Sequence, residues 1–202
     1  MKKNILSASC VIALGLSSFN VHSALMSNAH LSIDSGSYFD FLGVNPITGA
    51  DGINLGAVQH YDFSFAGGID YFVFLGAPGM HYTTSPTSVL STSGNTAALD
   101  FSGWSWAFNG ASSSFNLGSG AWAGNAEGVA DVVCAVDCGH GDTYTLIYSA
   151  TVPADEPNGY AGFVYSLNLT GTISSVPVPA AIWLFVSGLM SIFGLARFRR
   201  MN

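Results

Sequence analysis

The chain has 202 residues, a formal net charge of −7 and only 8% charged residues, and its charges are segregated along the sequence. All twelve acidic residues lie between Asp34 and Glu156, whereas the five basic residues lie at the two ends: Lys2, Lys3, Arg197, Arg199 and Arg200. A middle segment without Lys or Arg cannot displace counterions from a nucleic acid, so nucleic-acid binding is excluded. The same absence excludes an arginine clamp on a phosphoryl group and a Schiff-base lysine.

Residues 1–23 are predicted to form a cleavable signal peptide. A positively charged start is followed by an apolar stretch of about a dozen residues, from Ile5 to Leu16, which is too short for a membrane-spanning helix. Val21-His22-Ser23 has the pattern that a signal peptidase recognises, with Ala24 as the alternative cleavage point. Because basic residues stay on the cytoplasmic side of a membrane, we expect the segment between the two basic ends to be translocated.

Residues 176–202 are predicted to hold a transmembrane helix. Counting from Pro179 to Ala196, the segment has about 18 residues without charge, which rise roughly 27 Å as a helix and just span a bilayer core. Arg197, Arg199 and Arg200 follow and should hold the C-terminus in the cytoplasm. Apolar length and flanking charge alone would indicate a plain C-terminal anchor.

The same segment resembles the PEP-CTERM sorting signal in its Val-Pro-Leu-Pro-Ala variant. The resemblance rests on a Pro-x-Pro motif, a short apolar span with a Ser-Gly-Leu run, and an arginine cluster: Val176, Pro177, Val178, Pro179, Ala180, Ala181, Trp183, Arg197, Arg199 and Arg200. It implies handling by an exosortase, a membrane transpeptidase-like enzyme of Gram-negative bacteria that make exopolysaccharide. Val178 stands where the family usually has Glu, so the exosortase subtype and the position of any cut stay open.

Residues 24–175 have an apolar pattern of period two, which is typical of strands with one buried face. The clearest alternations are Tyr61/Phe63/Phe65, Trp104/Trp106/Phe108, Tyr144/Leu146/Tyr148 and Phe163/Tyr165/Leu167/Leu169. The denser run Ile69–Leu75 predicts a central strand, and residues 76–79 predict a turn. About nine to eleven short strands favour an all-β fold, an antiparallel sandwich or jelly roll. Residues 95–104 and 141–146 also resemble ectodomains that precede this tail variant, which implies no activity.

Cys134 and Cys138 are the two cysteines of the predicted exported part. An even count in an oxidising compartment indicates a disulfide, whose small ring would stabilise the fold by about 2 kcal/mol. The alternative adds His140 and Asp142 to form a metal site. Zinc needs free thiolates, which an oxidising compartment removes, so the disulfide is preferred and no metal is expected.

Three tryptophans, Trp104, Trp106 and Trp122, could stack on sugar rings. Aromatic residues in strands more often belong to a core, so burial is the competing interpretation. The sequence around Ser105, residues 103–107, differs from the G-x-S-x-G nucleophile motif only at Ala107. That motif requires a strand-turn-helix corner. The alternation around Ser105 continues a strand instead, so we interpret it as a strand serine.

Paired carboxylates would suit a secreted glycosidase, and five aspartates lie on or beside predicted strands: Asp62, Asp70, Asp100, Asp131 and Asp142. The sequence brings no two of them to a defined separation. Residues 155–159 read as a hairpin turn, and a Ca²⁺ contact there is kept only as an alternative because no Asp-x-Asp-x-Asp-Gly loop is present. No other cofactor is expected.

Together these features predict a non-enzymatic, exosortase-sorted protein of the cell envelope or extracellular matrix of a Gram-negative bacterium. We expect it to be structural or associated with exopolysaccharide and biofilm, after passing through an inner-membrane-anchored intermediate. Its partners during export would be signal peptidase and exosortase. The C-terminal helix would anchor the protein in the membrane. The alternatives are a carbohydrate-binding module, which exposed tryptophans in a row would indicate, and a glycosidase, which two facing carboxylates in a cleft would indicate.

Overall fold

The computed structural model describes residues 25–61, 68–108, 115–118, 128–152 and 159–175. Within these ranges the chain forms β-strands and no helix. The strands are β1 (Ala29–Leu31), β2 (Tyr38–Asp40), β3 (Val44–Ala50), β4 (Ile53–Asn54), β5 (Asp70–Phe74), β6 (Ala77–Thr83), β7 (Val89–Ser93), β8 (Thr96–Asp100), β9 (Trp104–Phe108), β10 (Phe115–Asn116), β11 (Val129–Cys134), β12 (Thr143–Thr151) and β13 (Val164–Ser175).

The predicted signal peptide (1–23) and sorting tail (176–202) lie outside the described residues. A search of the described ranges finds no helix of the length and apolar character that crossing a bilayer requires. The described residues all fall within the range 24–175 predicted for the ectodomain, and the all-β character expected there is confirmed for them.

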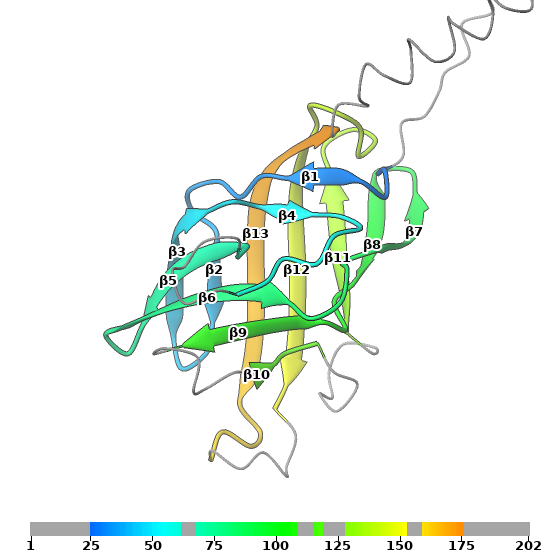
Figure 1. Ribbon diagram of the computed structural model, residues 1–202. Coiled ribbons are helices and arrows are strands. Elements are labelled where there is room, and N and C mark those ends of the chain that lie inside the picture. Colours follow the sequence, from blue (N-terminus) through cyan, green and yellow to red (C-terminus); the bar gives the residue numbers. More distant parts are fainter. Residues whose placement is uncertain (1–24, 62–67, 109–114, 119–127, 153–158, 176–202) are drawn as a thin grey trace, which may run out of the picture.

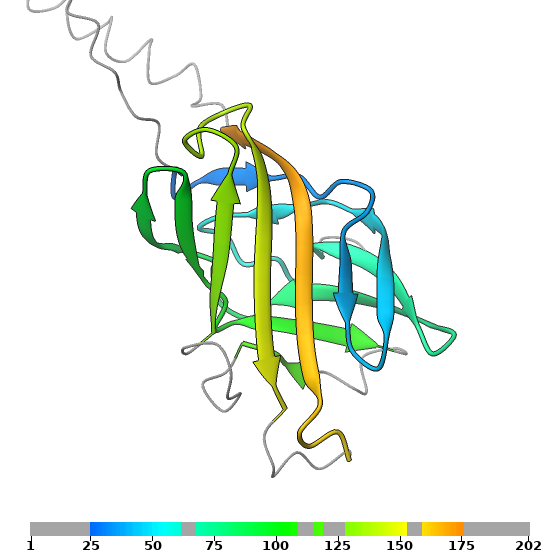
Figure 2. The same ribbon diagram turned by 180° about the vertical axis from the view of Figure 1, so that it is seen from behind.

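All the strands join in one antiparallel sheet that curls over itself to form two facing layers (Figures 1 and 2). The strand order is β10-β9-β6-β5-β3-β2-β13-β12-β11-β8-β7; β1 also pairs with the upper end of β13, and β4 pairs with β1. β11, β12 and β13 run lengthwise in one layer, and β5, β6 and β9 cross them in the other (Figure 1). Among the described residues this order ends at β7 and β10.

β3 is the corner at which the chain passes from one layer to the other. Its first residues, Val44–Pro46, pair with β2, and its last residues, Ile47–Ala50, pair with β5. The register shifts between Ile47 and Gly49. An extra residue of this kind bends and twists a strand, which is what turning the sheet between layers requires.

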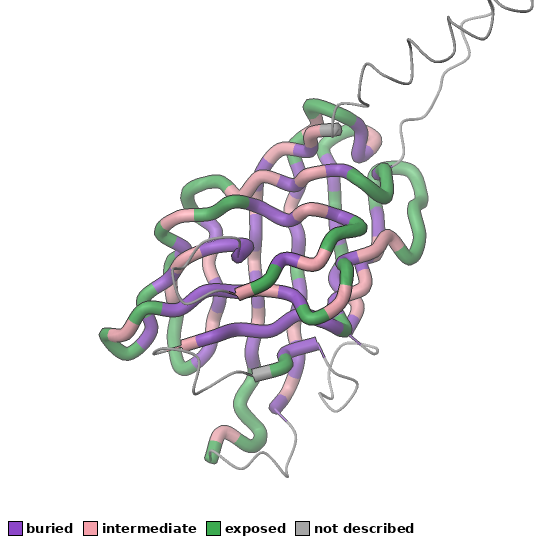
Figure 3. Tube along the Cα trace, in the orientation of Figure 1, coloured by how far each residue is buried: buried purple, intermediate pink, exposed green. Residues whose placement is uncertain are grey.

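Period-two alternation is confirmed most clearly in β12. Tyr144, Leu146 and Tyr148 are buried, whereas Thr143 and Ile147 are exposed. The neighbouring β13 repeats the pattern with buried residues at every second position from 165 to 173. Figure 3 shows the same alternation of buried and more exposed positions along β11 to β13. These three strands supply one wall of the core with one face and meet solvent with the other.

The turn predicted at residues 76–79 lies earlier, at Leu75 and Gly76. Both residues have positive φ, 50° and 79° respectively, as a tight two-residue hairpin turn requires. Ala77, Pro78 and Gly79 then form the start of β6 and pair with β5. Gly79 is tolerated in a strand because the Phe72 ring, which lies opposite it, occupies the space of a side chain.

The strand count and two burial patterns also differ from expectation. The described residues contain thirteen strands instead of nine to eleven, because β4 and β10 are two residues long and too short to show a period. The run Ile69–Leu75 does lie inside the sheet, but Val73 is 56% exposed, so that strand has one open face. β9 departs in the other direction, with both faces buried from Trp104 to Ala107.

An aromatic core joins the two layers. Phe39 of β2 packs against Phe72 of β5 with ring centroids 4.6 Å apart, and against Trp106 of β9 at 5.6 Å. Phe101 stacks on Trp104 at 4.4 Å. Each such side chain stabilises the fold by about 1.5–3 kcal/mol through burial. Packing of the large aromatic rings is therefore the main apolar contact between the two layers.

Candidate functional site

A chain of polar side chains runs through the middle of the aromatic core. Asp70 of β5 accepts a hydrogen bond from the backbone N–H of His81 on β6, at 2.9 Å, and contacts His81 Nδ1 at 2.8 and 2.9 Å. The hydroxyl of Tyr165 on β13 lies 2.7 Å from His81 Nε2. All three side chains are fully buried. The chain therefore links the layer of β5 and β6 to the facing layer of β13.

Burial keeps the tyrosine of this network protonated. It raises the pKa of Tyr165 well above its usual value, the Trp104 side chain lowers it, and the negative charge of Asp70 raises it again. The hydroxyl therefore keeps its proton at physiological pH and forms a hydrogen bond with Nε2 of His81. On the other side of the ring, Nδ1 of His81 forms a hydrogen bond with the Asp70 carboxylate.

The acid, imidazole and hydroxyl groups occur here in the order of a nucleophilic triad. Their burial indicates that they stabilise the core instead. The His81 ring stacks on Trp104 at 5.4 Å and packs beside Phe72 at 4.9 Å. With no exposed surface on any member, no substrate can reach the Tyr165 hydroxyl. His81 was not among the predicted functional residues, because its only local signal is a histidine inside a strand.

The Cys134–Cys138 disulfide is confirmed, with a Cα–Cα distance of 5.2 Å. Asp142 holds the loop between the cysteines by accepting hydrogen bonds from the backbone N–H groups of Val136, Asp137 and Cys138, at 2.9, 3.0 and 3.1 Å. Slight burial raises the pKa of Asp142, but these N–H donors outweigh it and lower the pKa below its usual 3.8.

The alternative metal site at this loop is wrong, because two of its four proposed ligands are bonded to each other. Both sulfur atoms are joined in the disulfide, and the Asp142 carboxylate is used by backbone donors. No group of three or more His, Cys, Asp or Glu side chains able to hold a metal occurs among the described residues. The disulfide and Asp142 thus stabilise the loop that connects β11 to β12.

The sugar-stacking interpretation is wrong for two of the three tryptophans. Trp104 is 0% exposed and Trp106 is 2% exposed, so neither ring has a face open to a ligand. Trp122 lies outside the described residues. Ser105 is buried at 2% exposure within β9, as expected of a strand serine and not of a nucleophile.

Most of the candidate carboxylates also serve the fold. Asp70 belongs to the buried network, Asp142 to the disulfide loop, and Asp100 accepts a hydrogen bond from the Ser102 N–H at 2.8 Å. Asp62 lies outside the described residues, as do residues 155–158 of the turn considered for Ca²⁺. Asp131 is the exception, because it is exposed on β11.

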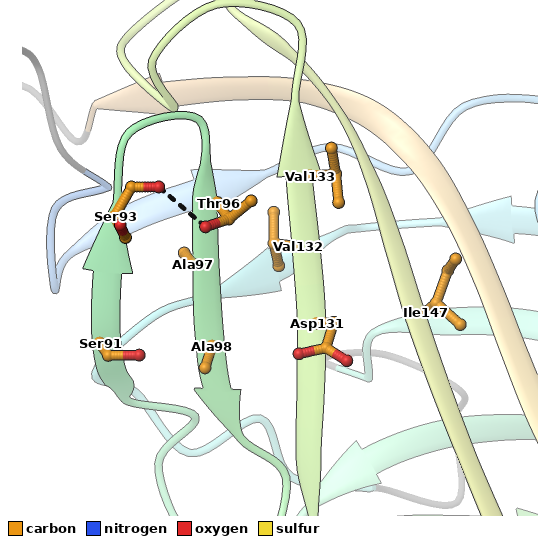
Figure 4. Close-up of a pocket in the computed structure, with 9 residues that line it drawn as sticks. All are labelled: Ser91, Ser93, Thr96, Ala97, Ala98, Asp131, Val132, Val133 and Ile147. Atoms are coloured by element: carbon orange, nitrogen blue, oxygen red, sulfur yellow. Dashed lines mark hydrogen bonds between the residues drawn. The ribbon is translucent and has the colours of Figure 1, made fainter.

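Asp131 lies in an open groove of about 520 Å³ on the outer face of β7, β8, β11 and β12 (Figure 4). Ala98 of β8 and Ile147 of β12 stand directly opposite it on either side. The remaining outward-facing residues of the groove are Ser91, Ser93, Thr96 and Val133. Val133 and Ile147 are 47% and 50% exposed. A carboxylate, three hydroxyls and two aliphatic side chains therefore share one accessible surface, which we call the outer groove.

Comparison with known proteins adds no assignment to this geometry. No family model matches the chain, and neither a curated protein nor a solved structure matches it significantly.

Proposed function

We propose that the chain is an exported, non-enzymatic protein of the cell envelope or extracellular matrix. A signal peptide at 1–23 would deliver it, and an exosortase would recognise the Pro-x-Pro tail at 176–202. The observation that carries the proposal is the segregation of charge, with no Lys or Arg between the basic ends and an apolar span just before the C-terminal arginines. Within this proposal the ectodomain is a sandwich or jelly roll and the tail is a transmembrane helix.

Three features of the described part support this proposal. The Cys134–Cys138 disulfide suits an oxidising compartment outside the cytoplasm. The most triad-like side chains, Asp70, His81 and Tyr165, are sealed in the core, so they offer no substrate a reacting group. Burial of Trp104 and Trp106 removes the argument for an aromatic sugar-binding platform on β9.

Processing of the tail tests the proposal. A plain anchor needs only apolar length, whereas a recognised signal needs the extended backbone that Pro177 and Pro179 impose outside the membrane. We expect mature protein from an exosortase-containing host to lack the peptide 180–202, as measured by mass spectrometry. Replacing both prolines by alanine, or deleting the exosortase, should leave an uncleaved inner-membrane precursor.

The matched control replaces Ile192 and Phe193 by Leu, which alters the apolar span but keeps both prolines and the rest of the sorting motif, and it should be processed as the wild type is. If the wild-type protein retains residues 180–202 in a host with the enzyme, the sorting proposal is refuted. The chain would then be an ordinary tail-anchored β-domain.

A further inference from the structure

The outer groove combines a free carboxylate with hydroxyl and aliphatic groups. None of the hydrogen bonds formed within the described part of the chain uses the Asp131 carboxylate. Thr96 donates its hydroxyl proton to the Ser93 carbonyl at 2.8 Å, which leaves its oxygen as an acceptor (Figure 4). Val133 and Ile147 lie beside these groups and are about half exposed. Hydrogen-bond acceptors and small apolar side chains thus alternate across β7, β8, β11 and β12.

Charge narrows the class of ligand that this surface can bind. A phosphate or an acidic polymer would be repelled by Asp131, and the sequence supplies no Lys or Arg between residues 4 and 196 to offset that repulsion. A second copy of the chain fits poorly for the same reason, because its ectodomain has no Lys or Arg to pair with Asp131. The groove also lacks the aromatic and arginine side chains that dominate protein interfaces.

We propose that the outer groove binds a neutral polysaccharide. Sugar hydroxyls would donate hydrogen bonds to Asp131, and the oxygens of Ser91 and Thr96 would accept others. Ile147 and Val133 would pack against the C–H faces of the sugar rings. This inference rests on the proposed matrix function and names the class of molecule that the ectodomain holds.

The shape of the surface indicates a polymer instead of a single sugar. The groove is open, so it buries too little of a small ligand to hold it tightly. The row Ala98–Asp131–Ile147 continues in register to Asn168 of β13. Three steps between strands cover roughly 14 Å, along which a chain of sugars can make repeated weak contacts.

The test uses the mature protein and polysaccharide from cultures of the producing cells, separated by anion exchange into neutral and acidic fractions. In affinity electrophoresis, the neutral fraction should retard the wild-type protein and the acidic fraction should not. Asp131→Ala should weaken retardation by the neutral fraction about tenfold or more, because a hydrogen bond to a charged group is lost. Asp51→Ala, at an exposed aspartate outside the groove, should bind as the wild type does.

A second pair of variants places a cation on the same sheet face, inside or outside the groove. Ile147→Lys puts an ammonium directly opposite Asp131 and should abolish binding of the neutral fraction, whereas Val164→Lys on β13 should not. The two parent residues are matched in exposure, at 50% and 54%. Unchanged thermal unfolding of all four variants would show that each protein is folded.

Three outcomes overturn the proposal. The first is that neutral polysaccharide fails to retard the wild-type protein, and the second is that Asp131→Ala binds it equally well. The third is a dimer that Ile147→Lys dissociates and Val164→Lys does not, because a second copy would then occupy the groove. Tail removal, measured on the same samples, reports on exosortase sorting separately, so either proposal can fail while the other stands.

Discussion

Polar side chains on the inner face of the sheet are buried and hydrogen-bonded to one another, whereas those on the outer face are exposed to solvent. On the inside, Asp70, His81 and Tyr165 satisfy one another within an aromatic core and have no exposed surface. On the outside, Asp131 stands between Ala98 and Ile147 and faces solvent. The residues with the more catalytic appearance are thus committed to stability. The plainer carboxylate is the one available to a ligand.

The largest expected effect comes from breaking the buried network. Asp70→Ala should lower the free energy of unfolding by about 3–5 kcal/mol, because it leaves the Nδ1–H and backbone N–H of His81 buried without an acceptor. Urea unfolding, followed by tryptophan fluorescence, measures the change. The matched outer variant, Asp131→Ala, should stay within about 0.5 kcal/mol of the wild type. Equal losses in the two variants would contradict the division between inside and outside.

A smaller effect is expected at the other end of the network. Tyr165→Phe keeps the ring and removes the hydroxyl that is hydrogen-bonded to His81 Nε2, so the free energy of unfolding should fall by about 1–2 kcal/mol. Combining Tyr165→Phe with Asp70→Ala in a double-mutant cycle sharpens the result. Because the two residues contact the same imidazole, their losses should not add. Strict additivity would mean that His81 does not couple them.

A smaller effect again is expected at Asp142, which is half-buried and accepts hydrogen bonds from backbone N–H groups. Its pKa is lowered in the folded state, so its ionised form stabilises the fold above the unfolded pKa, and this contribution is lost as pH falls below 3.8. Asp142→Asn should therefore be less stable than the wild type at pH 6, and the difference should shrink below pH 4. Urea unfolding over that pH range measures it. A difference that does not vary with pH would contradict the role of its charge.

The local sequence pattern predicted the strands that line one side of the core, but not the contacts made across the core. Alternation in β12 was visible from Tyr144 to Tyr148, because one face of that strand meets solvent. Burial of both faces of β9 was not visible, since it depends on which segments cover the strand. The contact between His81 and Tyr165 joins residues 84 positions apart. No local period reports a partner at that distance.

The candidate site shows the same limit. Asp131 was one of five aspartates of equal standing in the sequence, and only the sheet register sets it beside Ile147. The disulfide was predictable because Cys134 and Cys138 are four residues apart and lie in a part of the chain with no other cysteine. The short separation in sequence made the cysteine pair predictable. Neighbours that are brought together only by strand pairing, such as Asp131 and Ile147, were not predictable.

The position of β13 also sets the order in which the protein can fold. This strand pairs with β12 on one side and with β1 and β2, the first strands of the described chain, on the other. Ribosomes make the chain from its N-terminus at about 5–20 residues per second, so β1 and β2 wait on the order of ten seconds for their partner. Until then β1 and β2 can pair only with β4 and β3 on their other sides, and the long-range pairing with β13 is intrinsically slow. Synthesis must therefore be nearly complete before the sheet can close.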